Sequence, residues 1–242
     1  MLAIRLANAL NAWYYRTAGG ESRPPFLDID QMLPALRVVD RAYPDIRAEI
    51  APVLAERAAL PRFHDVDPAQ ANISATTPHD WRVMHLWLMG TPVEPHWSRF
   101  PKTARALTAV PDLFSATVSI LDAGKSVPAH NGPTCGYLRY HLGLVVPAED
   151  PPRIRVKDQY YTWREGESVL FDDSWEHEVF NTAKEPRVVL IVDVLRPMPL
   201  PQRISSRFAA RVARQLYAKP VAQRTREHVA AAKGGGPADS AA

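Results

Sequence analysis

Apolar positions change their spacing partway along the chain, and this change divides the sequence into zones. Between Ile29 and Ala59, apolar residues recur mostly three and four positions apart with charged residues between them, which predicts helices. Asp28 is suited to cap the start of this stretch, and Pro44 is expected to break it into two helices. Residues 1–107 are therefore predicted to form a helical region that packs on a core.

Short β-branched and aromatic runs separated by turn sequences fill the stretch from Asp112 to Pro197. The runs are FSATVSIL, GYLRYHLGLVV, RIRV, QYYTWRE, SVLF and RVVLIVDV, with AGK, PAEDPP, EGE and AKEP among the intervals. Strands at such close spacing favour a closed or two-sheet antiparallel structure, such as a jelly roll. Residues 108–200 are therefore predicted to form a β core, so the fold class is mainly β with flanking helices.

The last zone is predicted to be a basic helix over residues 201–233. Phe208, Val212 and Leu216 lie four positions apart on one stripe of this helix. From Pro199 onward eight basic residues oppose two acidic ones, a net charge of +6, so the rest of the chain carries −3 of the overall +3. The last nine residues, 234–242, have the sequence GGGPADSAA and are predicted to be a disordered tail.

The basic zone has three interpretations. A solvated helix face is the commonest reason for such a run of charge. Contact with an anionic membrane surface is the first alternative, and it would make the protein peripheral at the membrane. Nucleic acid is the second, and it is not expected because the zone lacks the interleaved aromatic residues of single-strand binders.

Composition narrows the class of protein. An apolar fraction of 46% in 242 residues is enough for a full core, and no apolar run reaches the roughly 18 residues that span a membrane. Cys135 is the one cysteine, so no internal disulfide can form. The N-terminal sequence does not have the pattern of a secretory signal. A cytoplasmic protein is expected.

Two histidines in the β zone, His130 and His177, are the first candidates for chemistry. They are 47 residues apart, and histidines on neighbouring sheet elements can converge on one metal. Neutral imidazoles suit Fe(II), which binds nitrogen and oxygen ligands and keeps positions open for substrate and O2.

A second set of candidates is basic and lies on strands. Arg139 and His141 are two positions apart and should face the same side, with Leu138 and Tyr140 on the other. A bound carboxylate would satisfy both Arg139 and His141, and Arg187 could form a bidentate pair with a dianion at the sheet end. The alternative is that the two arginines pair with nearby acids of the chain itself. These acids are Asp172, Asp173 and Asp193.

Three segments together resemble one enzyme family. HNGPTCGYLRYHLGLVVP, GESVLFDDSWEHEVFN and RVVLIVDVLRP look like successive motifs of the aspartyl/asparaginyl β-hydroxylases. These are Fe(II)- and 2-oxoglutarate-dependent dioxygenases with a double-stranded β-helix fold, which is a cupin-like jelly roll. The match covers about Ser119 to Pro197, and the region before it resembles short bacterial members of the family.

The resemblance implies a role for each matching residue. His130 and His177 would be the iron ligands and the catalytic centre, and Arg187 would hold the distal carboxylate of 2-oxoglutarate. The cosubstrate pocket would be completed by Arg139, His141 and Ser119. Fe(II), 2-oxoglutarate and O2 are the implied cofactor and cosubstrates.

Two positions next to these motifs differ from common patterns. Many non-haem iron sites have a carboxylate two residues after the first histidine, but this chain has Gly132 there, as members of the family do. Glu176 and Glu178 would point away from the site as strand neighbours of His177, whereas Asp172 or Asp173 could orient a histidine. Tyr137 stands where members that act on aspartyl residues carry a substrate-binding arginine.

The sequence thus predicts hydroxylation of an unactivated carbon by an iron-dependent dioxygenase. The substrate is an aspartyl or asparaginyl side chain, in a peptide or a free amino acid, or alternatively a lipid acyl chain, because short bacterial relatives hydroxylate lipid A and ornithine lipids. A small-molecule, peptide or lipid partner is therefore expected. A non-catalytic β-helix that binds a small acid is the alternative from another class.

Overall fold

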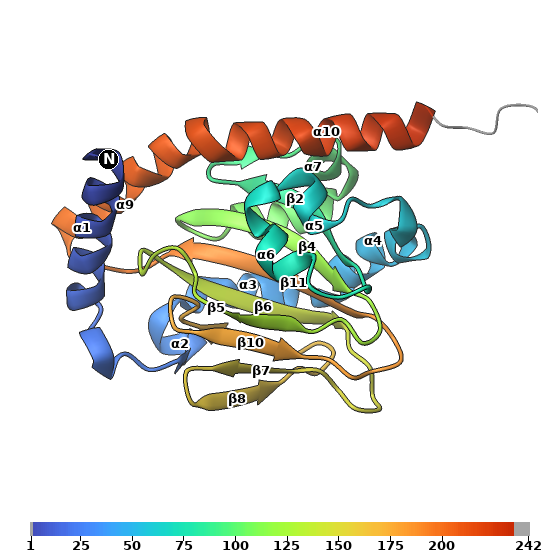
Figure 1. Ribbon diagram of the computed structural model, residues 1–242, viewed down its shortest axis with the longest axis horizontal. Helices are drawn as coiled ribbons and strands as arrows, with labels where there is room; N and C mark the ends of the chain where they lie inside the picture. Colours follow the sequence, from blue (N-terminus) through green and yellow to red (C-terminus); the bar gives the residue numbers. More distant parts are fainter. Residues whose placement is uncertain (1, 235–242) are drawn as a thin grey trace, which may run out of the picture.

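Two antiparallel β-sheets packed on each other form the centre of the molecule (Figure 1). The computed structural model describes residues 2–234. The larger sheet has seven strands, which are in spatial order β1 (Phe26–Leu27), β9 (Ser168–Phe171), β6 (Tyr137–Val145), β11 (Arg187–Leu195), β4 (Leu113–Leu121), β2 (Trp81–Leu88) and β3 (Thr91–Pro92). The smaller sheet has four, which are β5 (Val127–His130), β10 (His177–Phe180), β7 (Arg153–Val156) and β8 (Gln159–Thr162).

After β4 the chain passes back and forth between the two sheets. β5 lies in the smaller sheet, β6 in the larger, β7 and β8 in the smaller, β9 in the larger, β10 in the smaller and β11 in the larger. This winding of antiparallel strands between two sheets is a jelly roll, or double-stranded β-helix. The predicted fold class, mainly β with flanking helices, is confirmed.

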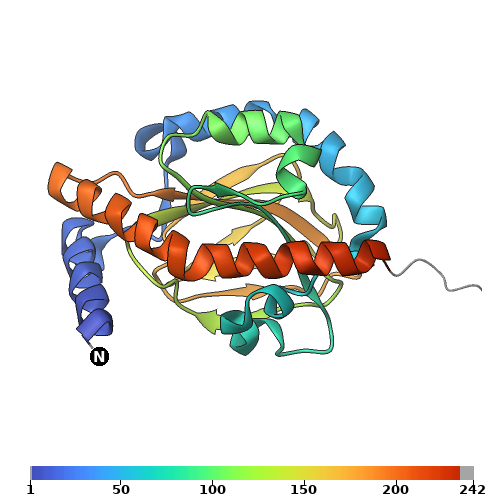
Figure 2. The same cartoon turned by 90° about the horizontal axis from the view of Figure 1, so that it is seen from above.

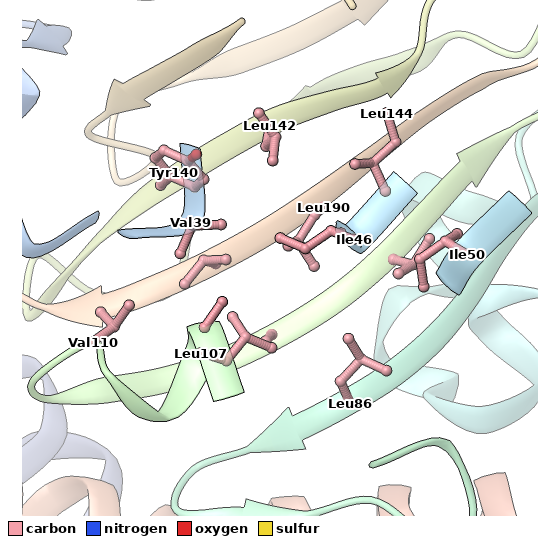
Figure 3. Packing of buried hydrophobic residues seen from close by; sticks show 14 of the residues in the cluster. Val39, Ile46, Ile50, Leu86, Leu107, Val110, Tyr140, Leu142, Leu144 and Leu190 are labelled. Atoms are coloured by element: carbon pink, nitrogen blue, oxygen red, sulfur yellow. The ribbon is translucent and has the colours of Figure 1, made fainter. Parts of the chain in front are cut away.

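The main hydrophobic core lies between the larger sheet and a layer of helices. These helices are α2 (Ile29–Met32), α3 (Arg37–Arg41), α4 (Tyr43–Ala55) and α8 (Pro101–Thr108). Figure 3 shows Ile46 and Ile50 of α4 among Leu86, Leu142 and Leu190 of the sheet. All five side chains are buried to 1% exposure or less, so this face of the sheet is closed to ligands.

The opposite face of the larger sheet, toward the smaller sheet, carries the polar candidates. On β6, Leu138 and Tyr140 belong to the main core, while the ring of His141 contacts Phe171 between the sheets. The predicted alternation along this strand is confirmed. The jelly roll therefore directs the functional candidates of β6 and β11 into one interior space.

The helical stretch begins and breaks where the sequence predicts. The Asp28 carboxylate accepts a hydrogen bond from the Gln31 amide at 3.0 Å and caps α2. Pro44 lies in the first turn of α4, directly after α3, where the N–H that proline lacks would have no partner within the helix. A further break occurs at the Pro34–Leu36 turn between α2 and α3.

The first 107 residues also contribute β1, β2 and β3 to the larger sheet. β2 pairs along most of its length with β4, and both its faces are covered. The remaining short helices of this part, α5 (Phe63–Val66), α6 (Ala71–Ser74) and α7 (His96–Arg99), lie along the β2 side of the molecule. The region is thus part of the sheet as well as a helical cover.

Helices from both ends of the chain meet beside the β core (Figures 1 and 2). One long, bent helical segment consists of α9 (Leu200–Ala213), a π-helical segment η5 (Arg214–Ala218) and α10 (Lys219–Gly234). α1 (Leu2–Thr17) lies against α9, where the Gln202 amide donates to the Thr17 hydroxyl at 2.9 Å.

The disordered tail was predicted for residues 234–242. Its first residue, Gly234, ends α10, and residues 235–242 lie outside the described range. Among the described helices none is long and apolar enough to cross a bilayer.

Candidate active site

His130 and His177 lie directly opposite each other on adjacent strands. They are register partners on β5 and β10, and their ring centroids are 4.2 Å apart with an interplanar angle of 52°. The antiparallel pairing therefore brings together two residues that are 47 positions apart in sequence. This is the convergence that a shared metal requires.

Both histidines are held in the tautomer that leaves a nitrogen free for a metal. The Nδ1 of His130 lies 2.8 Å from the Pro128 carbonyl oxygen, and the Nδ1 of His177 lies 2.9 Å from that of Trp175. A carbonyl only accepts, so each Nδ1 carries the hydrogen and each neutral ring keeps its lone pair on Nε2. Burial lowers the pKa of His130, and burial followed by the charge of His130 lowers the pKa of His177 to about 3.

Gly132 is the position where many non-haem iron sites place a third ligand, and here the Asp173 carboxylate fills the space around it. A Cβ at Gly132 would lie 2.6 to 2.8 Å from three atoms of that carboxylate. Asp173 accepts a hydrogen bond from the Tyr137 hydroxyl at 2.9 Å and pairs with Arg139 at 3.2 Å. Within residues 2–234 no set of three metal-binding side chains is assembled, so the chain offers two histidines.

Gly132→Ala is therefore expected to lower the free energy of unfolding by about 1–3 kcal/mol, the usual range for overpacking a filled site. Urea denaturation of both proteins measures this. Gly136→Ala in the same loop is the matched control, because its Cβ would meet nothing closer than 3.3 Å. The penalty should shrink in an Asp173→Ala background, which removes the clashing atoms. Equal penalties in both backgrounds would contradict the proposed clash.

Arg187 is a buried cation without an acidic partner among the described residues. It is 2% exposed, and its Nε and Nη1 make no hydrogen bond. Its guanidinium stacks on Trp163 at 4.2 Å, and burial lowers its pKa to about 9. A buried charge is stable only when it is paired. The site is therefore suited to receive an anion.

His141 lies beside this cation on the same tryptophan. Its ring stacks on Trp163, with centroids 5.7 Å apart, and neither ring nitrogen has a hydrogen-bond partner. Burial, and next the charge of Arg187, keep the pKa of His141 well below its usual value. The ring of Phe171 contacts those of His141 and His177, with centroids 4.9 and 6.1 Å away. Arg187 with His141 and the histidine pair therefore lie in the same part of the interior.

Ser119 lies on the same interior face. It is 1% exposed and is the register partner of Val189, which lies two residues after Arg187 on β11. Its oxygen accepts a hydrogen bond from Trp81 at 3.0 Å, which leaves its hydroxyl hydrogen to donate. The structure therefore places Ser119 where it could assist an anion held by Arg187.

Arg139 has acidic partners, unlike Arg187. Its Nε lies 2.8 Å from Asp193, and its Nη1 lies 3.2 Å from Asp173. The pairing with the chain's own acids, which the sequence left open for both arginines, therefore occurs at Arg139 and does not occur at Arg187. Arg139 lines the site with its charge already compensated.

Of the two sequence expectations for the acids near His177, the one for Asp172 and Asp173 is wrong and the one for Glu176 and Glu178 is confirmed. Neither the Asp172 nor the Asp173 carboxylate bonds to a site histidine, because backbone carbonyls take that place. Glu176 and Glu178 pair with Arg155 at 2.9 and 2.6 Å, on the side away from the site as predicted. The orienting carbonyls have no signature in the sequence, since any residue could supply them.

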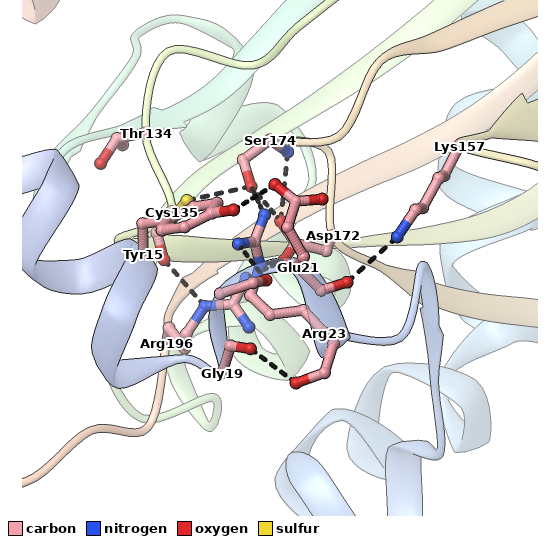
Figure 4. A network of polar contacts seen from close by, with 12 residues as sticks. Tyr15, Gly19, Glu21, Arg23, Thr134, Cys135, Lys157, Asp172, Ser174 and Arg196 are labelled. Carbon is pink, nitrogen blue, oxygen red and sulfur yellow. Dashed lines mark hydrogen bonds and ion pairs between the residues drawn. The ribbon is translucent and has the colours of Figure 1, made fainter.

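A buried ionic network fixes the loop that leads into His177 (Figure 4). Asp172 pairs with Arg23 at 2.8 Å and with Arg196 at 2.6 Å, and its carboxylate also accepts from the Ser174 hydroxyl. The Arg23 guanidinium lies 4.2 Å from the ring of Trp175. Segments following α1 and β11 therefore hold the carbonyl that orients His177.

Comparison with known proteins defines the class. The aspartyl/asparaginyl β-hydroxylase family profile matches residues 40–197. The chain is 37% identical over 204 residues to the ornithine lipid ester-linked acyl 2-hydroxylase of Rhizobium tropici, covering 84% of this chain and 70% of that protein. It is 40% identical over 129 residues to the human aspartyl/asparaginyl beta-hydroxylase, covering 51% of this chain and 17% of the human protein.

A solved oxidoreductase of the 2OG-Fe(II) oxygenase family from Burkholderia pseudomallei aligns with 62% of this chain and 79% of its own, at 12% identity and a TM-score of 0.41. The assignment rests on the sequence matches. The protein is a member of a hydroxylase family. It belongs to the aspartyl/asparaginyl β-hydroxylases, as the motifs around His130, His177 and Arg187 predict.

Proposed function

We propose that the protein is an Fe(II)- and 2-oxoglutarate-dependent hydroxylase whose centre is the His130–His177 pair. One observation carries this proposal. Two neutral histidines whose Nδ1 atoms bond to backbone carbonyls, which leaves Nε2 as the metal-binding nitrogen, lie in the same interior as a buried arginine without an acidic partner among the described residues. A metal and a dianionic cosubstrate together satisfy all of these groups. A metal alone would leave Arg187 without an anion, and a dianion alone would leave the two histidines without a metal.

The residues present fit both ligands. Nε2 of His130 and of His177 would hold Fe(II), and Arg187 with Ser119 would hold the distal carboxylate of 2-oxoglutarate. His141 and Arg139 would form the wall of the cosubstrate pocket, with Arg139 fixed by its two acids. When bound, iron, 2-oxoglutarate and O2 supply the oxidant for a C–H bond, and 2-oxoglutarate becomes succinate and CO2. The chain's part is to bind, orient and exclude water.

A lipid acyl chain is the substrate that we favour. The similarity to the Rhizobium tropici acyl hydroxylase covers 84% of this chain and so extends beyond the jelly roll. Tyr137 replaces the arginine that would anchor a substrate carboxylate, and its buried hydroxyl donates to Asp173. An acyl carbon needs no such anchor, whereas an aspartyl side chain does. The second candidate, an aspartyl or asparaginyl residue, is favoured by the 40% identity to the human enzyme.

Succinate formation distinguishes these candidates. The protein is loaded anaerobically with Fe(II) and 2-oxoglutarate, exposed to air, and supplied separately with acyl lipids, with peptides containing Asp or Asn, and with free amino acids. We expect acyl lipids to stimulate succinate release. Stimulation by peptides alone would replace the lipid assignment. If the protein bound neither iron nor 2-oxoglutarate, the non-catalytic alternative would hold.

Arg187→Ala is expected to weaken 2-oxoglutarate binding by roughly a hundredfold, since truncating one partner of a buried charge pair typically costs a few kcal/mol. Arg187→Lys should bind with intermediate affinity, because an ammonium cannot form the bidentate pair. Anaerobic calorimetry with Mn(II) in place of Fe(II) measures this. Arg47→Ala, at a half-exposed arginine that pairs with Glu165 on the surface, is the control and should bind normally. Unchanged 2-oxoglutarate binding by Arg187→Ala would mean that the cosubstrate does not bind at Arg187.

A further inference from the structure

The helix α9 exposes a continuous row of large apolar side chains. The row, which we call the α9 ridge and which extends into η5, consists of Leu200, Ile204, Phe208, Val212 and Leu216, which are 58%, 60%, 65%, 42% and 76% exposed. Residues four apart lie on one stripe of a helix. Most large apolar residues of the described chain are buried, so this concentration on one helix marks an interaction surface.

The helix α9 faces the protein with its polar side, whereas a helix that packs on a core faces it with its apolar side. Its inward side carries Gln202 and Ser206, which are buried, and Ala209 and Ala210, which are half-buried. A helix of a globular protein normally buries its apolar stripe and exposes its polar one. The described part of the chain therefore leaves the α9 ridge uncovered and available to a partner.

Charge along the α9 ridge selects the partner. Arg203, Arg207 and Arg211 each directly precede a ridge residue, and no acidic residue occurs between Leu200 and Ala218. Arg207 pairs with Asp112, whereas Arg203 and Arg211 are exposed with no acidic partner in the described chain. An apolar stripe flanked by arginines matches the interface of an anionic bilayer. A second copy of the chain would bring two rows of like charge together.

The helix α1 lies beside α9 (Figures 1 and 2) and also exposes apolar and basic side chains. Leu6 is 61% exposed, Arg5 and Arg16 are exposed, and α1 has no acidic residue. On its other side Asn11 of α1 accepts a hydrogen bond at 2.8 Å from the Cys135 amide, in the loop that follows His130. The helix beside the α9 ridge, α1, therefore contacts the loop that follows His130.

We propose that the α9 ridge, with the arginines beside it, is the surface by which this protein docks on an anionic lipid bilayer. Docking would bring the histidine pair to the membrane, where an acyl substrate lies, and in that respect it rests on the proposed function. The docking itself needs only the apolar row and the arginines. It does not require iron or turnover.

Co-sedimentation of the full chain with vesicles tests this, with and without Fe(II). The vesicles are pure phosphatidylcholine or phosphatidylcholine with about one third phosphatidylglycerol. We expect binding to the anionic vesicles at low salt and weaker binding at high salt. The double variant Ile204→Ser/Phe208→Ser should bind at least roughly tenfold more weakly, and Arg203→Gln/Arg211→Gln roughly tenfold more weakly. Tyr160→Ser, at a 57% exposed tyrosine on β8, is the control and should bind like wild type.

Three outcomes would overturn the docking surface. They are no binding to anionic vesicles, equal binding to neutral ones, and unchanged binding of the ridge variant. Sedimentation equilibrium adds one more, since a dimer that the ridge variant converts to monomer would assign the α9 ridge to a second copy. Vesicle binding without any iron or 2-oxoglutarate binding would instead contradict the proposed function and leave the docking surface standing.

Discussion

Replacing His177 with alanine is expected to abolish iron-dependent succinate formation, and His130→Ala should do the same. Among residues 2–234 no third metal-binding side chain joins the two histidines, so at the proposed iron centre each substitution would remove half of the protein's hold on the metal. Loss of a residue that only orients a metal ligand typically weakens affinity or activity by about 10–100-fold. Direct loss of one of two ligands should exceed that range. Anaerobic titration with Fe(II) and succinate release measure the two effects.

A histidine elsewhere separates this effect from general loss of stability. His228 lies half-exposed on α10, so His228→Ala should bind iron and turn over like wild type. Circular dichroism should show that His130→Ala and His177→Ala keep the jelly roll. If either variant retained near-normal iron affinity while folded, the metal would lie elsewhere and the proposed centre would be wrong.

The strand pattern could be predicted from the sequence where one face of a strand differs from the other. On β6 the alternation of Leu138 and Tyr140 with Arg139 and His141 corresponds to two different environments. β2 escaped prediction because both its faces are covered, so WRVMHLWL does not alternate cleanly. Its position in the sheet depends on pairing with β4, which no local pattern encodes.

The residues of the candidate site could be predicted from the sequence, but the groups that hold those residues in place could not. The family motifs identify His130, His177 and Arg187, and the structure brings them into one interior. The carbonyl groups that orient the histidines come from loop backbone, and the Asp173 carboxylate reaches Gly132 across 41 positions. Whether an arginine is paired also depends on long-range packing, as the 54-residue separation of Arg139 from Asp193 shows.

The C-terminal helix shows the limit of periodicity. The spacing of Phe208, Val212 and Leu216 identifies one stripe correctly, but an apolar stripe is ordinarily a buried one. Only the tertiary arrangement shows that this stripe faces outward and that Leu200 and Ile204 extend it. The combination of this outward apolar row with the proposed site for a small dianion is the reason for proposing a hydroxylase that works at a lipid surface.

Acid is expected to destabilise the metal-free protein steeply below about pH 6.5, the usual pKa of an unfolded histidine. Four histidines have lowered pKa values, chiefly because of burial. Those of His85 and His177 are lowered to about 3, that of His141 lies well below its usual value, and that of His130 is also lowered. A group whose folded-state pKa is lowered contributes stability that is present above its unfolded pKa and lost as the pH falls. Each such histidine reduces the folding equilibrium constant by about tenfold per pH unit in this window.

Asp173 opposes this loss of stability in acid. Burial raises its pKa to about 7, so below that pH the folded protein takes up a proton more readily than the unfolded chain does, and stability increases. This gain offsets about one of these histidines. The net expectation is therefore a loss of at least roughly a hundredfold in the folding equilibrium constant per pH unit below about 6.5.

Urea denaturation of the metal-free protein at several pH values between neutral and mildly acidic measures this slope. His85 is the informative position, because its Nδ1 contacts Thr117 at 2.9 Å and it lies outside the proposed iron site. His85→Asn should reduce the slope by about one histidine's share, roughly tenfold per pH unit. A flat stability profile in the wild type would mean that the folded protein protonates these histidines as readily as the unfolded chain does. The interior would then be open to water, which is incompatible with a site that excludes it around the C–H bond.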